Sequence, residues 1–213
     1  AAQKQMNLGL LFAFIFTLPT AVILISLNEP IIGAIYGRGN FTQEHVTAAA
    51  PALAAFALGL PAYMAMKVVS TAFFANKDTR TPFKGGMIAI ITNLLFIALF
   101  MPCMKHIGIA LATTLSSWCN WIYLTVKLGK LWQIRIDGST IKECLKQLLI
   151  SGIMFASILI ANICYADRCY IEGETLRNLA LLIVLGISII IFLIAGKISG
   201  AFSFMKEIKS IDK

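Results

Sequence analysis

One basic side chain lies inside a run of residues apolar enough to cross a membrane. Lys67 lies in the stretch 46–75, nine residues before Asn76, which places it about 13 Å along a helix axis from that end. An ammonium group at such a depth costs roughly 3 kcal/mol to insert. Its long side chain can reach back to the polar surface, or it can face a cavity and bind an anion. We favour the cavity, because the stretch contains no acidic residue to pair with Lys67.

Uncharged polar residues also occur within the apolar runs. Four of them follow the spacing i, i+3, i+4 and i+7 of one helical face: Thr113, Ser116, Ser117 and Asn120. Lipid does not solvate polar groups, so this face points into the protein. It either bonds to neighbouring helices or lines a wet cavity, and Asn93 in the preceding run poses the same choice. We expect Lys67, Asn93 and Asn120 to be the substrate-contacting residues.

The sequence contains few residues in positions that could carry catalysis. All ten acidic residues fall outside the long apolar runs, and the two histidines, His45 and His106, lie in or beside loops. There is no Walker sequence and no metal-ligand spacing, so we expect no enzyme activity, no metal site and no cofactor. Among the five cysteines, Cys164 and Cys169 lie near one membrane face and would pair only if that face is oxidising.

The segment NKDTRTPFK (76–84) is the most specific local sequence between two runs. Asp78 suits an Asx turn, Thr81 suits the N-cap of the next helix, and Pro82 suits its first turn. These structural roles can explain the whole segment. Its three cations could also attract a phosphate headgroup at a lipid surface.

The composition indicates elements that are surrounded by lipid. Charged residues make up 13% of the chain, against about 25% in a soluble domain, and the mean hydropathy is +0.84. A helix needs about 20 apolar residues to cross the hydrocarbon core. The sequence therefore predicts an all-α polytopic membrane protein with six transmembrane helices: Leu8–Leu27, Val46–Ala75, Gly85–Met104, Ile107–Val126, Gln147–Tyr165 and Leu179–Gly196.

The basic residues predict the orientation of these helices. Thirteen of the 18 Lys and Arg residues fall in loops and ends on one side and four on the other, with Lys67 inside a span. The positive-inside rule places the richer side, with both ends, in the cytoplasm. The basic residues of the predicted cytoplasmic loops and ends account for the net charge of +8. We therefore do not expect this charge to bind nucleic acid. We divide the chain into four helices (1–130), a cytoplasmic basic loop (131–146) and a final helix pair with a cytoplasmic tail (147–213).

The run 46–75 is too long for one straight crossing. Its 30 residues would extend about 45 Å as a helix, against a hydrocarbon core of about 30 Å. Pro61 bends it, and small residues from Ala48 to Ala62 recur near helical spacing. This stripe either allows tight helix packing or belongs to a hinge in a moving helix.

Three segments carry a family resemblance: YGRGNFT (Tyr36–Thr42), ALGLPAYMAMKVVSTAFFANKDTRTP (Ala57–Pro82) and HIGIALATTLSSWCNWIYL (His106–Leu124). Their order resembles the C-terminal part of the MurJ (MviN) lipid II flippase family, in the MOP exporter superfamily. The motif residues are Arg38, Gly39, Asp78, Thr79, Arg80, Thr81 and Pro82. The resemblance extends from Leu8 to about Lys130, and beyond that it rests on helix number and position.

The resemblance implies more than composition does. Members of the family have two six-helix lobes and a final helix pair, and they move lipid II, the undecaprenyl-diphosphate-linked peptidoglycan precursor, across the bacterial inner membrane. This chain would be the second lobe of such a transporter plus the final pair, whose groove receives the lipid tail. Lys67 matches a basic position that faces the central cavity. The arginine cluster of the first lobe is absent here, and no initiator Met is present, so we expect a fragment that needs the missing N-terminal lobe.

Two other functions remain open at this point. One is a MOP-type exporter of drugs or of another polyprenyl-linked glycan, although the lack of acidic residues in the spans disfavours a proton-driven drug exporter. The other is a non-transporting scaffold for cell-wall enzymes. Lys67 and the polar stripe argue against a scaffold, because a scaffold has no need of polar groups inside the membrane.

Overall fold

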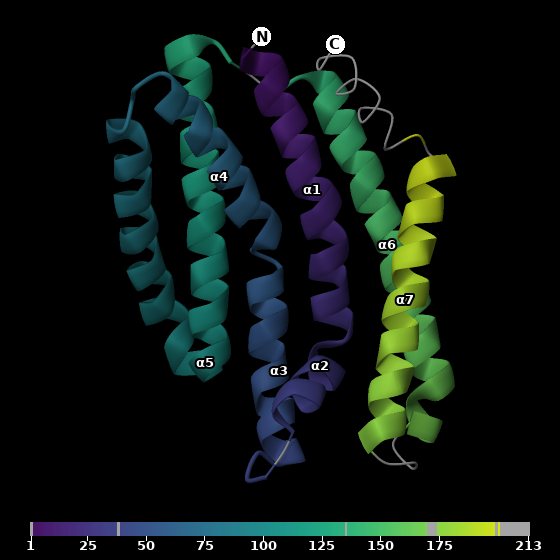
Figure 1. Ribbon diagram of the computed structural model, residues 1–213. Coiled ribbons are helices and arrows are strands. Elements are labelled where there is room, and N and C mark those ends of the chain that lie inside the picture. Colours follow the sequence, from purple (N-terminus) through teal and green to yellow (C-terminus); the bar gives the residue numbers. More distant parts are fainter. Residues whose placement is uncertain (1, 38, 135, 170–173, 199, 201–213) are drawn as a thin grey trace.

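The computed structural model describes the backbone of residues 2–37, 39–134, 136–169, 174–198 and 200, and their side chains except at 2, 161–181 and 198. This part of the chain is helical apart from short turns. Its long helices lie side by side along the long axis of the molecule (Figure 1). They are α1 (Ala2–Ser26), α2 (Asn28–Tyr36), α3 (Gln43–Ala57), α4 (Leu60–Ala75), α5 (Arg80–Trp132), α6 (Gly138–Cys169) and α7 (Glu174–Ile198).

The predicted run 46–75 is two helices joined by a short break. The break falls at Leu58 and Gly59, where the Leu58 N–H donates to the Ala54 carbonyl and the Gly59 N–H donates to the Phe56 carbonyl. Pro61 lies in the first turn of α4. A backbone N–H at this position would have no acceptor within the helix, so proline removes no helical hydrogen bond there. The run is therefore interrupted near Pro61 as expected, but at Leu58 and Gly59 and not through a backbone bond that Pro61 removes.

Helix α5 folds back on itself and so accounts for two predicted spans. Lys105 has φ 49° and ψ −126°, which is not helical and separates a first arm (80–104) from a second arm (106–132). At this turn the arms are very close. A Cβ atom added to Gly108 would lie 2.7 Å from the carbonyl carbon and oxygen of Phe100. Glycine is thus needed at position 108 for the two backbones to approach.

Helix α1 is the centre of the packing, because it contributes to both apolar cores (Figure 1). On one side, Leu11 and Ile15 pack with residues of α6 and α7, among them Met154. On another side, Leu10 packs with α4 and the second arm of α5, among them Phe73. The final helix pair is therefore attached to the rest of the molecule mainly along α1.

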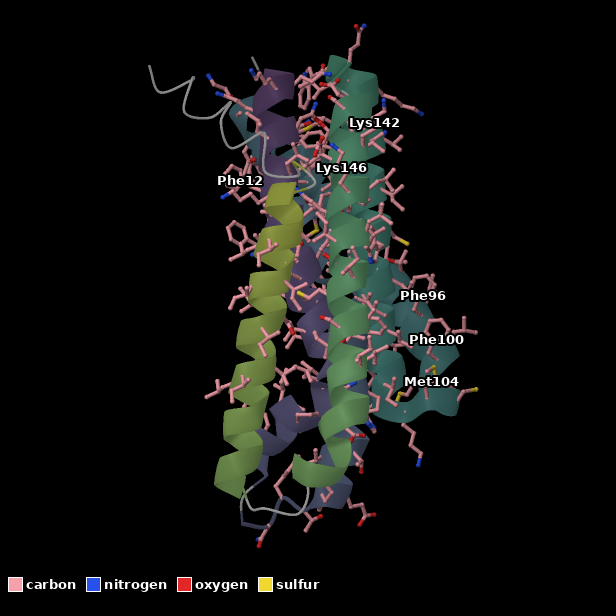
Figure 2. The ribbon with its side chains drawn as sticks, turned by 90° about the vertical axis from the view of Figure 1, so that its right-hand side faces the viewer. Phe12, Phe96, Phe100, Met104, Lys142 and Lys146 are labelled. Atoms are coloured by element: carbon pink, nitrogen blue, oxygen red, sulfur yellow. The ribbon has the colours of Figure 1, made fainter. Side chains whose placement is uncertain are left out.

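The surface fits a membrane protein that crosses the bilayer several times. Four described stretches are long and apolar enough to span, with α3 and α4 counted as one and α5 counted once despite its two arms, and a shorter apolar helix covers Leu182–Lys197. Phe96, Phe100 and Met104 project from the first arm of α5 away from the other helices (Figure 2). Such side chains can face lipid without cost. The number of six crossings remains a prediction.

The segment between the lobe and the final pair differs from expectation. We predicted a loop over 131–146, but α5 continues to Trp132 and α6 begins at Gly138. The predicted loop is therefore wrong for 138–146, which are the first turns of α6. These turns continue an exposed apolar stripe through Ile141, Leu145 and Leu149. Packing of α6 as one long helix overrides the local polar composition.

Candidate functional site

Lys67 lies on the exposed face of α4. Ala65, Val69 and Phe73 form the opposite, buried face of the helix. Within the described residues, no carboxylate forms an ion pair with Lys67. This side chain is therefore a cation that the described part of the chain leaves uncompensated and accessible.

The surface around Lys67 continues onto α1. Gly9 of α1 lies against Val68, and a Cβ at Gly9 would be 3.0 Å from the Val68 Cγ1. Beside this contact, α1 presents Phe12 and Phe16, and Phe16 is 68% exposed. Phe12 projects outward from α1 (Figure 2). The candidate site is thus an exposed cation next to a close contact between α1 and α4.

Asn120 occupies a different environment from Lys67. It is only 6% exposed, and its amide Nδ2 donates to the Sδ of Met66 over 2.9 Å. A Cβ at Gly85 would lie 2.5 Å from the Asn120 Oδ1, so this side chain fills the space between α4 and the two arms of α5. The structure does not place Asn120 on one accessible surface with Lys67.

The rest of the polar stripe bonds mainly to its own helix. The hydroxyls of Ser116 and Ser117 both donate to the Thr113 carbonyl. The neighbouring Thr114 hydroxyl donates across to the Ala55 carbonyl over 2.7 Å. Of the two alternatives, these contacts favour helix packing over a wet cavity.

Asn93 lies on the first arm of α5. The arms are antiparallel, with Gly85 beside Asn120 and Gly108 beside Phe100, so Asn93 lies near the level of Thr113. Its side-chain Oδ1 is buried and has no hydrogen-bond partner in the described part. A buried carbonyl oxygen without a donor is costly. Asn93 is therefore a polar group inside the α5 hairpin, separate from the exposed face of α4.

The end of α4 is a compact turn. The Asp78 N–H donates to the Phe73 carbonyl and the Lys77 N–H donates to the Phe74 carbonyl, which is the Schellman arrangement. Lys77 has φ 59°, a left-handed conformation that this motif usually assigns to glycine. The turn directs the chain from α4 into the first arm of α5.

The Asp78 carboxylate then organises the start of α5. Its Oδ1 accepts from the N–H groups of Arg80 and Thr81, both at 3.0 Å, and its Oδ2 accepts from the Thr81 hydroxyl at 2.6 Å. The bond to Arg80 confirms the predicted Asx turn. These bonds favour the ionised carboxylate, so the Thr81 hydroxyl, followed by the Thr81 N–H, holds the pKa of Asp78 below its usual value.

The predicted cap at Thr81 is wrong. Helix α5 starts at Arg80 with Thr79 as its N-cap residue, and the Thr79 side chain makes no capping bond. Thr81 is instead a donor to Asp78, and Pro82 lies within the first turn as expected. An acid two residues before the helix satisfies the free N–H groups as well as an N-cap side chain would.

The turn before α3 holds the other motif residues. Gly39 has φ 60°, a conformation that glycine adopts without strain. Arg38 lies outside the described residues, as do the side chains of Cys164 and Cys169. A capping box that was not predicted lies here: the Thr42 hydroxyl and His45 Nδ1 lie 2.8 Å apart, and the Thr42 N–H donates to the same nitrogen. The pattern Thr-x-x-His was the available signal.

A second missed feature joins the N-terminus of α1 to the segment before α6. The side-chain amides of Gln3 and Asn7 donate to the two oxygens of Asp137, at 2.5 and 2.7 Å. Nothing in the local sequence around Asp137 indicates this contact. As for metals, the described residues contain no group of three or more His, Cys, Asp or Glu side chains that could hold an ion.

Comparisons with known proteins agree with this arrangement. A family model described as "Lipid II flippase MurJ" matches residues 1–181. The probable lipid II flippase MurJ of Rickettsia prowazekii is 38% identical over 154 residues, which are 72% of this chain and 30% of that protein. The lipid II flippase MurJ of Thermosipho africanus is 33% identical over 150 residues, covering 70% of this chain and 30% of that protein.

A solved structure, "Lipid II flippase MurJ, inward closed conformation", has a TM-score of 0.75 and 29% identity, covering 96% of this chain and 40% of that one. The chain therefore spans about 30% of the length of these curated relatives and corresponds to their C-terminal part. The match confirms the resemblance drawn from the three sequence segments, and the relatives are transporters rather than enzymes. The chain belongs to the MurJ family of lipid II flippases.

Proposed function

We propose that this chain is the C-terminal part of a protein that flips lipid II across the bacterial inner membrane by alternating access. The observation that carries the proposal is Lys67, an uncompensated cation on an exposed face of a helix within the apolar span Gln43–Ala75. A diphosphate is costly in hydrocarbon, and a cation facing a cavity lowers that cost. Lys67 would contact the diphosphate or the peptide carboxylates, opposite the missing N-terminal lobe.

The arrangement of the ends supports the proposed orientation. Asn7 and Asp137 are hydrogen-bonded, and the rings of Phe73 and Trp132 lie 5.1 Å apart. The N-terminus, the α4–α5 loop and the α5–α6 segment therefore lie at one end of the molecule, the upper end in Figure 1. These are segments for which the positive-inside rule predicts a cytoplasmic location.

The break between α3 and α4 is where we place the movement. Leu58 and Gly59 interrupt the helix inside a span, and interrupted helices recur in transporters that work by alternating access. The buried, small side chains of Ala55, Ala57 and Ala62 surround the break. They allow neighbouring helices to approach closely and to shift relative to one another.

A depletion and rescue experiment tests the function. The full-length parent of this chain is expressed in a bacterium depleted of its own lipid II flippase, and lipid II on the outer face is assayed. We expect rescue, with lipid II externalised. Failure of rescue by protein shown to be in the membrane would reject the proposal in favour of export of another lipid or a drug.

Lys67 is tested in the same strain. Lys67→Met keeps the length of the side chain and removes the charge, and we expect a loss of at least tenfold in lipid II externalisation. Lys67→Arg should retain most of the activity. Lys142→Met, which removes an exposed cation near the end of α6 (Figure 2), is the matched control and should behave as wild type. Wild-type activity in Lys67→Met would remove Lys67 from the site.

A further inference from the structure

The end of α5 forms the wall of an open cavity that the proposed transport does not use. Its volume is about 880 Å³, within the range of about 300–1,000 Å³ typical of small-molecule sites. It is formed where the chain leaves the last turns of α5. Its walls include Val126, Gly129, Lys130 and Gln133 of that helix end, and Ile134 and Ile136 of the segment that follows.

The cavity lies at the level of a membrane boundary. Lys127 Nζ lies 5.8 Å from the centre of the Tyr123 ring, and Trp132 packs against Phe73. Tyrosine, tryptophan and lysine side chains gathered in the last turns of a membrane-spanning helix are typical of the interface between lipid and water. A ligand in this cavity would therefore meet water on one side and acyl chains on the other.

Lys130 supplies a cation that no acid neutralises. The residues that line the cavity include no Asp or Glu, and no ion pair to Lys130 occurs among the described residues. Asp137, the nearest acid along the chain, is held by Gln3 and Asn7. The charge of Lys130 is thus available to an anionic group of a ligand.

The same cavity also offers hydrogen-bond acceptors. Gly129 has no side chain, so it lines the cavity with backbone atoms. The carbonyls of the last turn of α5 have no donor within the helix, and no backbone N–H elsewhere in the described part bonds to them. The negative end of the helix dipole favours a cation there. The site therefore suits a ligand that carries an anion and an ammonium close together.

We propose that this cavity binds the headgroup of an aminophospholipid such as phosphatidylethanolamine. Its phosphate lies on the Lys130 ammonium and its own ammonium lies on the last-turn carbonyls of α5. Val126, Ile134 and Ile136 contact the glycerol and the first carbons of the acyl chains. A soluble phosphate compound would leave these apolar walls unused, which is why the ligand is a lipid. The inference is independent of the substrate that the full-length protein transports.

Photolabelling of the full-length protein in nanodiscs tests the site. The nanodiscs carry a trace of photoreactive phosphatidylethanolamine, and the label on peptides between residues 123 and 137 is quantified. We expect Lys130→Gln and Val126→Trp each to reduce this label at least fivefold. Val126 is half exposed, so tryptophan can fill the cavity there without disturbing a core. Lys127→Gln, which removes a cation that does not line the cavity, is the control and should label as wild type.

Competition in the unmodified protein tests the chemistry separately from any folding defect. Unlabelled phosphatidylethanolamine should displace the label at least fivefold better than phosphatidylcholine, whose ammonium has no N–H, or phosphatidylglycerol, which has no ammonium. Equal competition by all three lipids would overturn the proposal, and so would wild-type labelling of both cavity variants. A preference for phosphatidylglycerol would reduce the site to a simple anion site and overturn the role of the carbonyls.

Discussion

At the scale of single residues, a charge or polar group is informative when its surroundings fail to explain it. Lys67 is such a residue, because neither its sequence context nor the described structure provides an anion. Asn120 looked equivalent in the sequence, yet its burial beside Met66 and Gly85 gives it a packing role. The difference arises because the residues around Asn120 come from distant parts of the chain, which no local pattern reveals.

Asp78 should make stability depend on pH. Its folded-state pKa is lowered below 3.8 by the Thr81 hydroxyl and N–H, so its stabilising effect is present above about pH 4 and is lost as the pH falls through the lowered pKa. We expect Asp78→Ala to lower the unfolding temperature in detergent at pH 7, and the difference from wild type to shrink below pH 4.

Thr81→Val is the matched variant for this effect. It keeps the carboxylate but removes the largest cause of the lowered pKa, so the loss of stability below about pH 4 should be smaller than in wild type and should be complete at a higher pH. An unfolding temperature for Asp78→Ala that stays the same distance below wild type at every pH would show that the ionised carboxylate is unimportant.

At the scale of elements, the sequence predicted helices and their order better than their ends. The interruption near Pro61 was indicated by a proline in an apolar run too long for one crossing, and the turn between the third and fourth runs by the polar pair Lys105 and His106. The start of α6 could not be predicted in this way, because the polar composition of 138–146 is typical of a loop. Whether a polar stripe such as Ser116 and Ser117 faces water was also undecided, since serine can satisfy its hydroxyl on its own helix.

Gly108 should be essential to the fold-back of α5. In Gly108→Ala the new methyl would lie 2.7 Å from backbone atoms of Phe100, which cannot rotate away as a side chain could. We expect a destabilisation of about 2 kcal/mol or more, the range typical of overpacking, measured by reversible denaturation in mixed micelles.

Gly86→Ala is the control for Gly108→Ala. Gly86 lies in the first arm of the same helix, and nothing lies within 4 Å of an added Cβ. Alanine is favoured over glycine in a helix by about 1 kcal/mol, so this variant should be neutral or more stable. Equal losses in the two variants would mean that the close approach of the arms does not matter.

At the scale of the whole molecule, α1 holds the lobe and the final pair together. Its residues pack into both apolar cores, and its N-terminal amides bind Asp137 at the entrance to α6. The sequence placed these segments in separate regions and indicated no contact between them. Such contacts depend on how complete helices pack, and composition determines only that each helix is apolar.

The link between Asn7 and Asp137 should appear as an energetic coupling. In a double-mutant cycle with Asn7→Ala and Asp137→Ala, we expect a coupling on the order of 1 kcal/mol, as for other hydrogen-bonded neighbours. Asn7→Ala combined with Asp78→Ala should be additive, because no bond joins those residues in the described structure. A coupling near zero for the first pair would show that the contact does not hold α6 to α1.

The central place of α1 has a consequence for biogenesis. Asn7 and Asp137 are 130 residues apart, and at roughly 5–20 residues per second a bacterial or eukaryotic ribosome needs on the order of ten seconds to synthesise that length. During this time Leu11 and Ile15 have left the translocon but have no α6 to pack against. In water, apolar side chains left exposed for this time would promote aggregation. Lipid tails are as apolar as leucine, so α1 can remain stable in the bilayer until α6 is synthesised.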